Sequence, residues 1–363
     1  MLRDTKHSIK YMKTRKPHIA VFFGGEEGSR DLSLESGYWA CQHIPREKYQ
    51  ITPVHVQPDG SWQVPLGSLP NRGPVDRMMD MLFRVPGQAV RAVNAPDGLQ
   101  RLLQRPLDGM MTLLRGRGGD DGSLHATGLT LGIPVVGSSA GSSQLAHNKH
   151  RMHTVIGDFA ALPDSALIHE KTPIDSAVND VKNQFAGPVF VKAVTQDGSS
   201  GTELVGSLDE LAPAIRRASR LGDVLIQEIA QGTEMAVTLF PDQHGSLISL
   251  PTTLVVHNRA PFYDYLAKRR PGRVNLSTAT GTPNDGPLIG EAEEIAREVY
   301  QELGCEGAVT IDVVADDNSI DVLDVNTIPM FTQATPLIGQ LKAGRLAPAS
   351  FLDTLLVGAI DPR

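Results

Sequence analysis

The residues of this sequence that are best suited to hold a metal ion lie in two apolar runs near its C-terminal end. β-Branched residues fill both runs and the polar turn 316–319 joins them, a pattern that predicts a β-hairpin. Side chains of a strand alternate between its faces, so Asp312 shares a face with Thr310, and Asp324 shares one with Asn326. Two carboxylates and an amide oxygen suit a hard cation such as Mg²⁺, which shares its coordination with water and substrate phosphate. The alternative is that the Asp-x-Asn motif only ends a strand before a proline turn.

Two lysines and two glycine-rich loops form a second group, suited to binding phosphate. Lys192 ends the apolar run VFVK, and the loop 197–201 (DGSSG) follows it. Such a loop can close over phosphates with amides and hydroxyls while the lysine supplies charge; an ordinary β-hairpin is the alternative. Lys149 lies in a helix predicted at 142–156. The loop 115–122 (RGRGGDDG) follows a predicted strand and could present backbone N–H groups to an anion, or could be only a turn.

Alternating strands and helices would position these residues. In the first half of the chain, the predicted strands are 18–23, 49–56, 107–114 and 132–137. A helix is predicted at 32–43, with Ser29 or Asp31 as its N-cap. This alternation predicts an open, largely parallel α/β domain. In the second half, the predicted strands are 189–192, 224–230 and 235–240. The predicted helices there are 208–219 and 288–303. The stretch 57–106 is irregular, and no role follows from its sequence.

The composition excludes several classes of protein. The chain has 363 residues, 40% of them apolar, with a net charge of −7 and a pI near 5.9, which argues against nucleic acid as a partner. No apolar run approaches the ~20 residues of a membrane span. Cys41 and Cys305 are far apart, so we expect a reducing compartment, the cytoplasm. Residues 1–17 are basic without an apolar stretch; we expect a flexible extension rather than a secretory signal, with a partner-binding arm as the alternative.

The order of these motifs resembles the ATP-grasp enzymes, and specifically the D-alanine–D-alanine ligase family. The resemblance covers roughly residues 18–340. Its best-matching segments are 24–25 with 33–36, 115–122, 131–138, 189–192, 197–201, 232–234, 262–268 and 324–329. It implies an α/β, three-domain ATP-grasp fold whose N-terminal domain has an open parallel sheet. After the extension 1–17, the implied domains are an N-terminal α/β domain at 18–137, a lid domain at 138–229 and a metal-binding catalytic domain at 230–363.

The resemblance also implies a set of residues for ATP. They are Lys149, Lys192, Ser199, Ser200, Gly201, Gln227, Glu228, Ala230 and Glu234. In the family, the two lysines hold the phosphates and the residues at 199–201 form a lid over the γ-phosphate. The segment 227–230 resembles one that contacts adenine largely through its backbone. Glu234 resembles the carboxylate that binds the ribose hydroxyls.

The remaining implied roles concern metal and catalysis. Asp312, Asp324 and Asn326 resemble the ligands of two Mg²⁺ ions, for which Mn²⁺ can substitute. Lys268 resembles the lysine of a loop that closes over the active site. In the family reaction, a substrate carboxylate attacks the γ-phosphate to give an acyl phosphate, and the amine of a second amino acid then displaces phosphate. A closed lid, which includes Ser199, keeps water from hydrolysing the acyl phosphate.

The sequence departs from the family pattern around the amino-acid substrates. In the first loop, Ser29 stands where the family has a glutamate that receives the amino group of the first substrate. In the closing loop, Arg269 stands where the family usually has tyrosine. Arg115 stands in the place of a histidine before the second glycine-rich loop. Arg115, Arg117 and Arg269 are therefore candidates to supply replacement positive charge from another direction.

Further departures lie on the predicted hairpin and its exit. Thr310 stands in the place of an arginine that stabilises the tetrahedral intermediate, and Met330 in the place of a glycine whose N–H helps to form the oxyanion site. Asp324 replaces the usual glutamate. Thr335 replaces a serine that grips the carboxylate of the second substrate. Because one lost oxyanion donor can cost about 10²–10³ in rate, the second half-reaction is expected to differ from that of the family.

Three interpretations of function follow. The first is an ATP- and Mg²⁺-dependent carboxylate–amine ligase that resembles D-alanine–D-alanine ligase. The second is a divergent ligase that joins other amino acids, as in natural-product assembly. The third is a nucleotide-binding protein that has lost ligation. For all three we expect small-molecule substrates, no nucleic-acid or membrane partner, and a homodimer only because the family suggests one.

Overall fold

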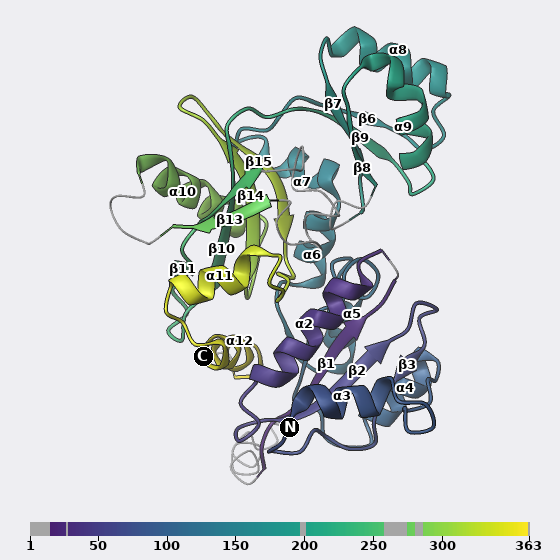
Figure 1. The fold of residues 1–363 in the computed structure, drawn as a ribbon, viewed down its shortest axis with the longest axis vertical. Helices are drawn as coiled ribbons and strands as arrows, with labels where there is room; N and C mark the ends of the chain where they lie inside the picture. The colour runs from purple at the N-terminus through teal and green to yellow at the C-terminus, as the bar shows by residue number, and fades with distance from the viewer. Residues whose placement is uncertain (1–14, 27, 197–200, 258–273, 280–285, 362–363) are drawn as a thin grey trace, which may run out of the picture. The chain divides into compact units, whose positions relative to one another are not determined.

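The computed structural model describes residues 15–26, 28–196, 201–257, 274–279 and 286–361. They divide into two compact units (Figure 1). The first unit comprises the chain up to Gly119, the segment Ser123–Gly137 and the segment from Ala347 onward. The second comprises Asp120–Gly122 and Ser138–Leu346. Ser199, Ser200, Lys268 and Arg269 lie outside the described residues.

A five-stranded sheet forms the centre of the first unit. Its strands, in the order β3-β2-β1-β4-β5, are Trp62–Gln63, Gln50–Val56, His18–Gly24, Gly109–Thr112 and Val135–Val136. The four strands from β2 to β5 run parallel, and only the edge strand β3 is antiparallel. Every residue of β1 is buried, as expected for a central strand covered on both faces. The predicted open, largely parallel sheet is confirmed.

Helices cover this sheet and bring the C-terminal segment back to it. They are α2 (Arg30–His43), α3 (Val75–Phe83), α4 (Ala95–Leu102), α5 (Ser123–Leu131) and α12 (Pro348–Ile360). Helix α2 lies directly on β1, because a Cβ atom at Gly37 would come within 2.3 Å of the ring of Phe23. Helix α12 packs against β4, β5 and α2. The first turn of α2 is thereby fixed close to the carboxyl end of β1.

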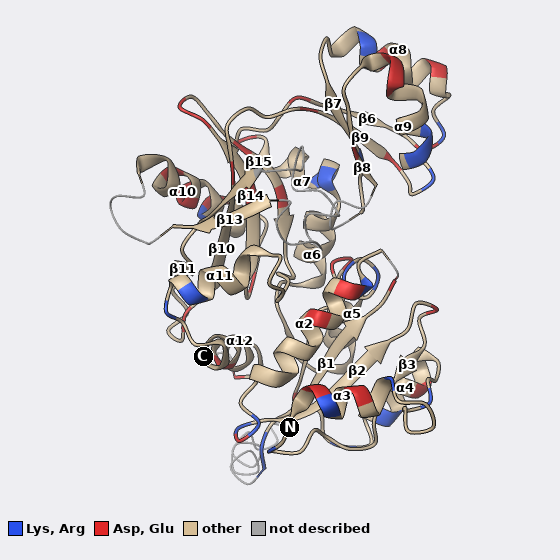
Figure 2. Cartoon of the chain, viewed as in Figure 1, with Lys and Arg blue, Asp and Glu red and all other residues tan. Residues whose placement is uncertain are grey.

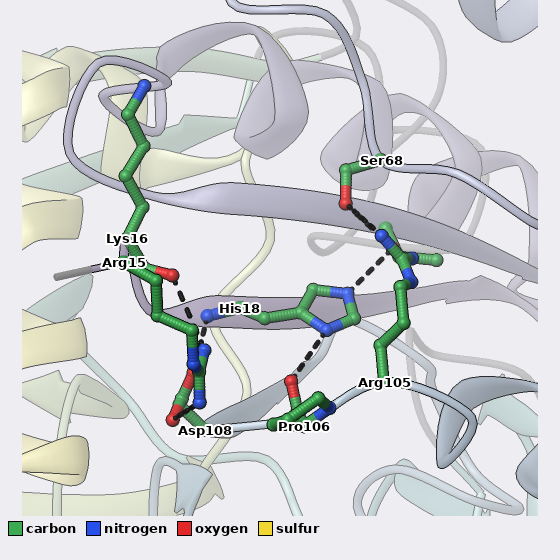
Figure 3. Close-up of polar contacts among 8 residues, drawn as sticks. Arg15, Lys16, His18, Ser68, Arg105, Pro106 and Asp108 are labelled. Atoms are coloured by element: carbon green, nitrogen blue, oxygen red, sulfur yellow. Dashed lines mark hydrogen bonds and ion pairs between the residues drawn. The ribbon is translucent and has the colours of Figure 1, made fainter. Parts of the chain in front are cut away.

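The first strand begins in a buried polar network (Figure 3). The backbone N–H of His18 donates to Asp108 at 2.7 Å, and Nδ1 of its ring lies 3.0 Å from the carbonyl oxygen of Pro106. Since that carbonyl can only accept, Nδ1 carries the proton and Nε2 accepts from the hydroxyl of Thr52 at 2.8 Å. Arg105 donates to the same hydroxyl. Burial lowers the pKa of His18, so the imidazole is neutral.

The stretch 57–106, irregular in sequence, is a folded part of the first unit. It contains β3, α3 and α4, and Trp62 packs edge-on against Phe22 of β1 with 5.1 Å between ring centroids. A mostly apolar cavity of about 630 Å³ lies between α3, the end of α4 and the loop 64–70. The stretch therefore extends the core of the unit rather than forming a loose connection.

The second unit contains two antiparallel sheets. The four strands of the smaller sheet, in the order β6-β9-β7-β8, are Ser165–Ile168, Val224–Glu228, Val189–Ala193 and Thr202–Val205. Helices α8 (Ile174–Gln184) and α9 (Leu211–Ala218) pack against it around one apolar core. Figure 2 shows charged residues of both signs on these helices.

The larger sheet holds the predicted metal hairpin. Its main strands, in the order β13-β12-β10-β14-β15, are Val274–Thr278, Thr253–His257, Thr233–Pro241, Val309–Ala315 and Ile320–Asn326, and β11 (Leu247–Ser249) pairs with β10. Helix α10 (Pro287–Glu302) packs on β10, β14 and β15, and α6 (Ala140–His147) contacts β15. Helix α11 (Pro336–Ala343) contacts β12 and β13. The alternate side chains of β14, at Val309, Ile311 and Val313, enter the core.

The prediction of one continuous helix at 142–156 is wrong, although the segment is helical on both sides of one break. The structure has two helices there, α6 and α7 (Lys149–Ile156), separated at Asn148. Asn148 has an extended backbone, and its side chain accepts a hydrogen bond from the N–H of Arg151, which makes it the N-cap of α7. Lys149 therefore begins a new helix instead of lying inside a long one.

Within the described ranges, no single helix is long and apolar enough to cross a membrane. Helices α11 and α12 pass that test only when taken together, by length and composition, and they are separated by a sharp bend.

Candidate active site

The predicted hairpin is present, and it brings the three oxygen-bearing side chains together. In the register of β14 and β15, Asp312 faces Asp324 and Thr310 faces Asn326. The amide nitrogen of Asn326 donates to Asp312 at 3.2 Å. An irregularity follows this pair, because Val313 faces Val322 and Leu323 of β15 is skipped. The extra residue lets both Val322 and Val325 enter the core while Asp324 stays on the polar face.

Lys149 connects this hairpin to the helix that precedes it. Its ammonium lies 3.4 Å from a carboxylate oxygen of Asp324 and donates to the carbonyl oxygen of Gln196 at 3.1 Å. The side chain is only 7% exposed. A buried ammonium requires such partners, since an isolated charge in a dry site is costly. The capped start of α7 holds Lys149 at the edge of the oxygen cluster.

Lys192 comes from the smaller sheet of the same unit. It lies on β7, and its ammonium donates to the side-chain oxygen of Gln227 on the neighbouring strand β9. Beyond Gln227, Glu228 is exposed at the end of β9, and Ala230 follows it. Glu234 lies near the start of β10, opposite Val314 of β14. The residues that the family resemblance assigns to phosphate, adenine and ribose thus lie on or directly after the strands β7, β9 and β10 of the second unit.

Of the loop 197–201, predicted to form a lid, the structure describes only the last residue, Gly201. Gly201 has a positive φ of 67°, a conformation that favours glycine, and its carbonyl oxygen accepts from the N–H of Ala193 at 3.0 Å. That bond closes the β7–β8 hairpin directly after Lys192. Ser199 and Ser200 fall outside the described residues, as do Lys268 and Arg269 of the predicted closing loop.

In the first unit, the loop that begins at Gly24 and the loop that follows Leu113 are both tied to α2. The hydroxyl of Ser33 accepts from the N–H of Gly24 at 2.9 Å and donates to the carbonyl oxygen of Leu113 at 2.6 Å, which ties both loops to α2. Ser29 is the N-cap residue of α2, but its side chain makes no capping hydrogen bond. Arg115 is buried at 6% exposure. Polar side chains are thus held at the carboxyl ends of β1 and β4, and Ser33 and Arg115 among them are buried.

Three of the residues that depart from the family pattern on the hairpin and its exit, Thr310, Met330 and Thr335, are buried. The hydroxyl of Thr310 lies 2.8 Å from that of Thr238 on β10, and both are buried. The hydroxyl of Thr335 donates to the carbonyl oxygen of Met330 at 2.7 Å. Met330 and Thr335 are each 8% exposed. The place expected for an arginine side chain is therefore held by a compact hydroxyl pair.

One residue near the lysines has no counterpart in the sequence-based prediction. His153 lies on α7 and is 6% exposed. Burial and then the charge of Lys192 lower its pKa to about 4. The sequence did contain one signal for His153. This histidine lies four residues after Lys149 in a predicted helix, and residues with this spacing share a face.

The chemistry of the hairpin suits a cation that is only partly held by protein. In the described part of the chain, no three residues among His, Cys, Asp and Glu are grouped to hold a metal ion. Asp312 and Asp324 do face each other, however, with the amide of Asn326 beside them. Two carboxylates and an amide oxygen suit Mg²⁺, which keeps several water or phosphate oxygens of its own.

Known proteins resemble both parts of the chain. A family model described as D-ala D-ala ligase N-terminus matches residues 18–138, and one described as D-ala D-ala ligase C-terminus matches residues 155–357. A D-alanine–D-alanine ligase of Corynebacterium aurimucosum is 27% identical over 96% of this chain and 99% of its own length. One of Leptospira biflexa is 26% identical over 90% of this chain and 94% of its own.

Solved structures share the fold. The VanG D-Ala:D-Ser ligase of Enterococcus faecalis matches with a TM-score of 0.75 at 22% identity, covering 94% of this chain and 99% of its own. The D-alanine–D-alanine ligase of Coxiella burnetii also matches with a TM-score of 0.75, at 20% identity, over 95% and 96% of the two chains. The expected ATP-grasp type of α/β fold is thereby confirmed. With both family models matched along most of its length, this chain belongs to the D-alanine–D-alanine ligase family and is an ATP-dependent carbon–nitrogen ligase.

Proposed function

We propose that this protein activates the carboxylate of D-alanine, or of a similar small amino acid, with ATP and joins it to the amine of a second amino acid. The observation that carries the proposal is the contact between Lys149 and Asp324, at 3.4 Å, beside Asp312 and Asn326. A buried cation against a pair of carboxylates suits a site where phosphate and a divalent cation meet. The family membership supports the class of reaction.

The second unit supplies the residues proposed to bind ATP. Lys149 and Lys192 hold the phosphates, and the lid ending at Gly201 covers them. The end of β9, at Gln227–Ala230, receives the adenine, and Glu234 binds the ribose. Lysine ammonium groups offset the negative charge that accumulates during phosphoryl transfer.

Asp312, Asp324 and Asn326 would hold Mg²⁺, or Mn²⁺ in its place. When bound, the ion would neutralise phosphate charge and orient the γ-phosphate toward the attacking carboxylate. The protein itself fixes the geometry of this site through the paired strands β14 and β15. Asn326 presents either its amide nitrogen or, after rotation of the amide, its oxygen to that site.

The amino-acid sites are proposed to differ from those of typical relatives. Ser29 and Arg115 of the first unit, with Lys268 and Arg269 of the closing loop, are assigned to the substrates and to the charge that develops on them. Thr310, Met330 and Thr335 are assigned to the part of the site that binds the second amino acid. The hydroxyl pair of Thr310 and Thr238 is neutral, so it cannot replace an arginine as a source of positive charge.

Several wider parts of the proposal rest on the family rather than on contacts. They are the division of residues 138–363 into a lid domain and a catalytic domain near residue 229, assembly as a homodimer, and a cytoplasmic location.

The proposal is tested by measuring phosphate release from Mg-ATP in the presence of D- and L-amino acids, singly and in pairs. Stimulation by D-alanine alone is the expected result, with a dipeptide as product. Stimulation only by another pair would replace D-alanine with a different substrate but keep the reaction. ATP binding without turnover under any combination would overturn ligase activity and leave a binding protein.

A further inference from the structure

His153 lies on α7, the helix whose first residue, Lys149, contacts Asp324 of the hairpin. It follows Lys149 by four residues, so the two side chains emerge one above the other on one face of the helix. Both are buried, at 6% exposure each. Met152 and Ile156 lie on the adjoining part of the same buried side and enter the apolar core, which fixes the rotation of the helix.

Neither ring nitrogen of His153 has a hydrogen-bond partner among the described residues. A neutral imidazole carries one N–H donor and one acceptor nitrogen. Buried polar atoms of native proteins almost always have a partner, either from the protein or from something bound to it. A side chain with both polar atoms unpartnered therefore points to a ligand.

The groups that face the ring identify the chemistry of that ligand. The charges acting on His153 are, in decreasing order, those of Lys192, Asp324, Lys149 and His150. Two of these groups are lysine ammonium groups, and two positive charges near the ring favour an anion there. Asp324 already contacts Lys149 and belongs to the carboxylate pair on the hairpin, so the missing acceptor is an anionic oxygen from outside the chain.

We propose that His153 is a further binding residue for the polyphosphate of the nucleotide, to which its ring N–H donates a hydrogen bond between Lys149 and Lys192. The inference rests on the proposed binding of ATP to these lysines. The remaining ring nitrogen is an acceptor, suited to a lysine ammonium. The histidine thus adds a directed donor beside two flexible point charges.

The proposal is tested by calorimetric titration of the wild-type chain and its variants with two probes. The first probe is the Mg²⁺ complex of AMP-PNP, an ATP analogue that is not turned over. The second is adenosine, which has no phosphate. In His153→Ala, we expect affinity for Mg-AMP-PNP to fall about tenfold or more, the scale of a hydrogen bond to a charged group, while affinity for adenosine is unchanged.

Two further variants separate the hydrogen bond from packing and from general charge. His153→Gln keeps an N–H donor of similar reach, and we expect it to recover part of the lost affinity for Mg-AMP-PNP. Arg151→Ala removes an exposed cation from the same helix two residues away and should bind both probes as the wild type does. Equal losses for both probes in His153→Ala would show a structural role and overturn the proposal.

The outcomes also separate this inference from the function on which it rests. If the wild type and His153→Ala bind Mg-AMP-PNP equally well, the role of His153 is overturned while ATP binding stands. If the wild type binds Mg-AMP-PNP no more tightly than a Lys149→Ala, Lys192→Ala double variant, the proposed phosphate site is overturned, and the role of His153 with it.

Discussion

At the scale of single residues, the β14–β15 hairpin carries both the residues proposed to bind the metal ion and residues that depart from the family pattern. Lys149 is buried and contacts the half-buried carboxylate of Asp324, which suits a site that limits the access of water to a charged reaction. Thr310, on the same strand face as Asp312, is bonded to Thr238 instead of presenting a charge. The two halves of the ligase reaction are therefore open to separate tests.

Replacing Lys149 tests the first half. Lys149→Ala removes the ammonium that contacts Asp324, and we expect amino-acid-dependent phosphate release to fall by about 10²-fold or more, the scale of losing one preorganised donor. Lys182→Ala is the matched control, because Lys182 is exposed and pairs with exposed Asp209. Equal activity of the two variants would contradict a phosphate-binding role for Lys149.

The hydroxyl pair is tested by a mutant cycle. Thr310→Val leaves the buried hydroxyl of Thr238 without its partner, and we expect the free energy of unfolding to fall by about 1–3 kcal/mol. Adding Thr238→Val removes both hydroxyls and should restore most of that loss. Additive losses in the double variant, measured by urea unfolding, would show that the two residues do not act as a pair.

At the scale of elements, the sequence was most informative where one pattern dominates. The β14–β15 hairpin was predicted from β-branched runs around a polar turn, and only the skipped residue Leu323 was not foreseen. A bulge depends on which side chains the core accepts, and no local pattern encodes that. Similarly, the pattern at 142–156 is compatible with one helix, and the break at Asn148 follows from a capping bond.

The cap of α7 gives a prediction for that element. Asn148→Ala removes the side-chain oxygen that accepts from the N–H of Arg151, and we expect the free energy of unfolding to fall by about 0.5–2 kcal/mol. Because the cap also fixes Lys149, affinity for Mg-AMP-PNP should weaken as well. Asn148→Asp keeps an acceptor and serves as the control. Unchanged stability and affinity in Asn148→Ala would show that packing alone sets the start of the helix.

At the scale of the whole molecule, the order of motifs along the chain predicted the family, although each motif alone was ambiguous. The stretch 57–106 could not be assigned, because its helices are short and its packing depends on contacts such as that of Trp62 with Phe22. His153 was missed because a single histidine in a helix is uninformative until its neighbours from other strands are known.

Buried histidines make stability dependent on pH. Burial lowers the pKa of His18, and burial lowers that of His55 and of His153 to about 4, below the ordinary value of 6.5. Between these values the unfolded chain binds protons that the folded chain does not. The free energy of unfolding is therefore expected to be maximal above pH 6.5 and to fall as pH drops toward 4.

A variant isolates one of these contributions. Between pH 6.5 and pH 4, the protonation of His55 lowers the free energy of unfolding by roughly 3 kcal/mol. In His55→Gln, the urea midpoint should therefore fall less over this pH range than it does in the wild type. His169→Gln is the control, because the side chain of His169 is 71% exposed. A slope that is the same in His55→Gln and the wild type would contradict the assignment.

The central claim is that a substrate carboxylate is activated by phosphoryl transfer at the proposed site of Lys149, Lys192 and the β14–β15 hairpin. The most direct test uses D-alanine labelled with ¹⁸O in its carboxylate, incubated with Mg-ATP and the protein. Attack of a carboxylate oxygen on the γ-phosphate, followed by displacement of phosphate by an amine, moves that oxygen to phosphate. We expect one ¹⁸O in each released phosphate, together with equal amounts of ADP and dipeptide. Phosphate without ¹⁸O would contradict an acyl-phosphate mechanism.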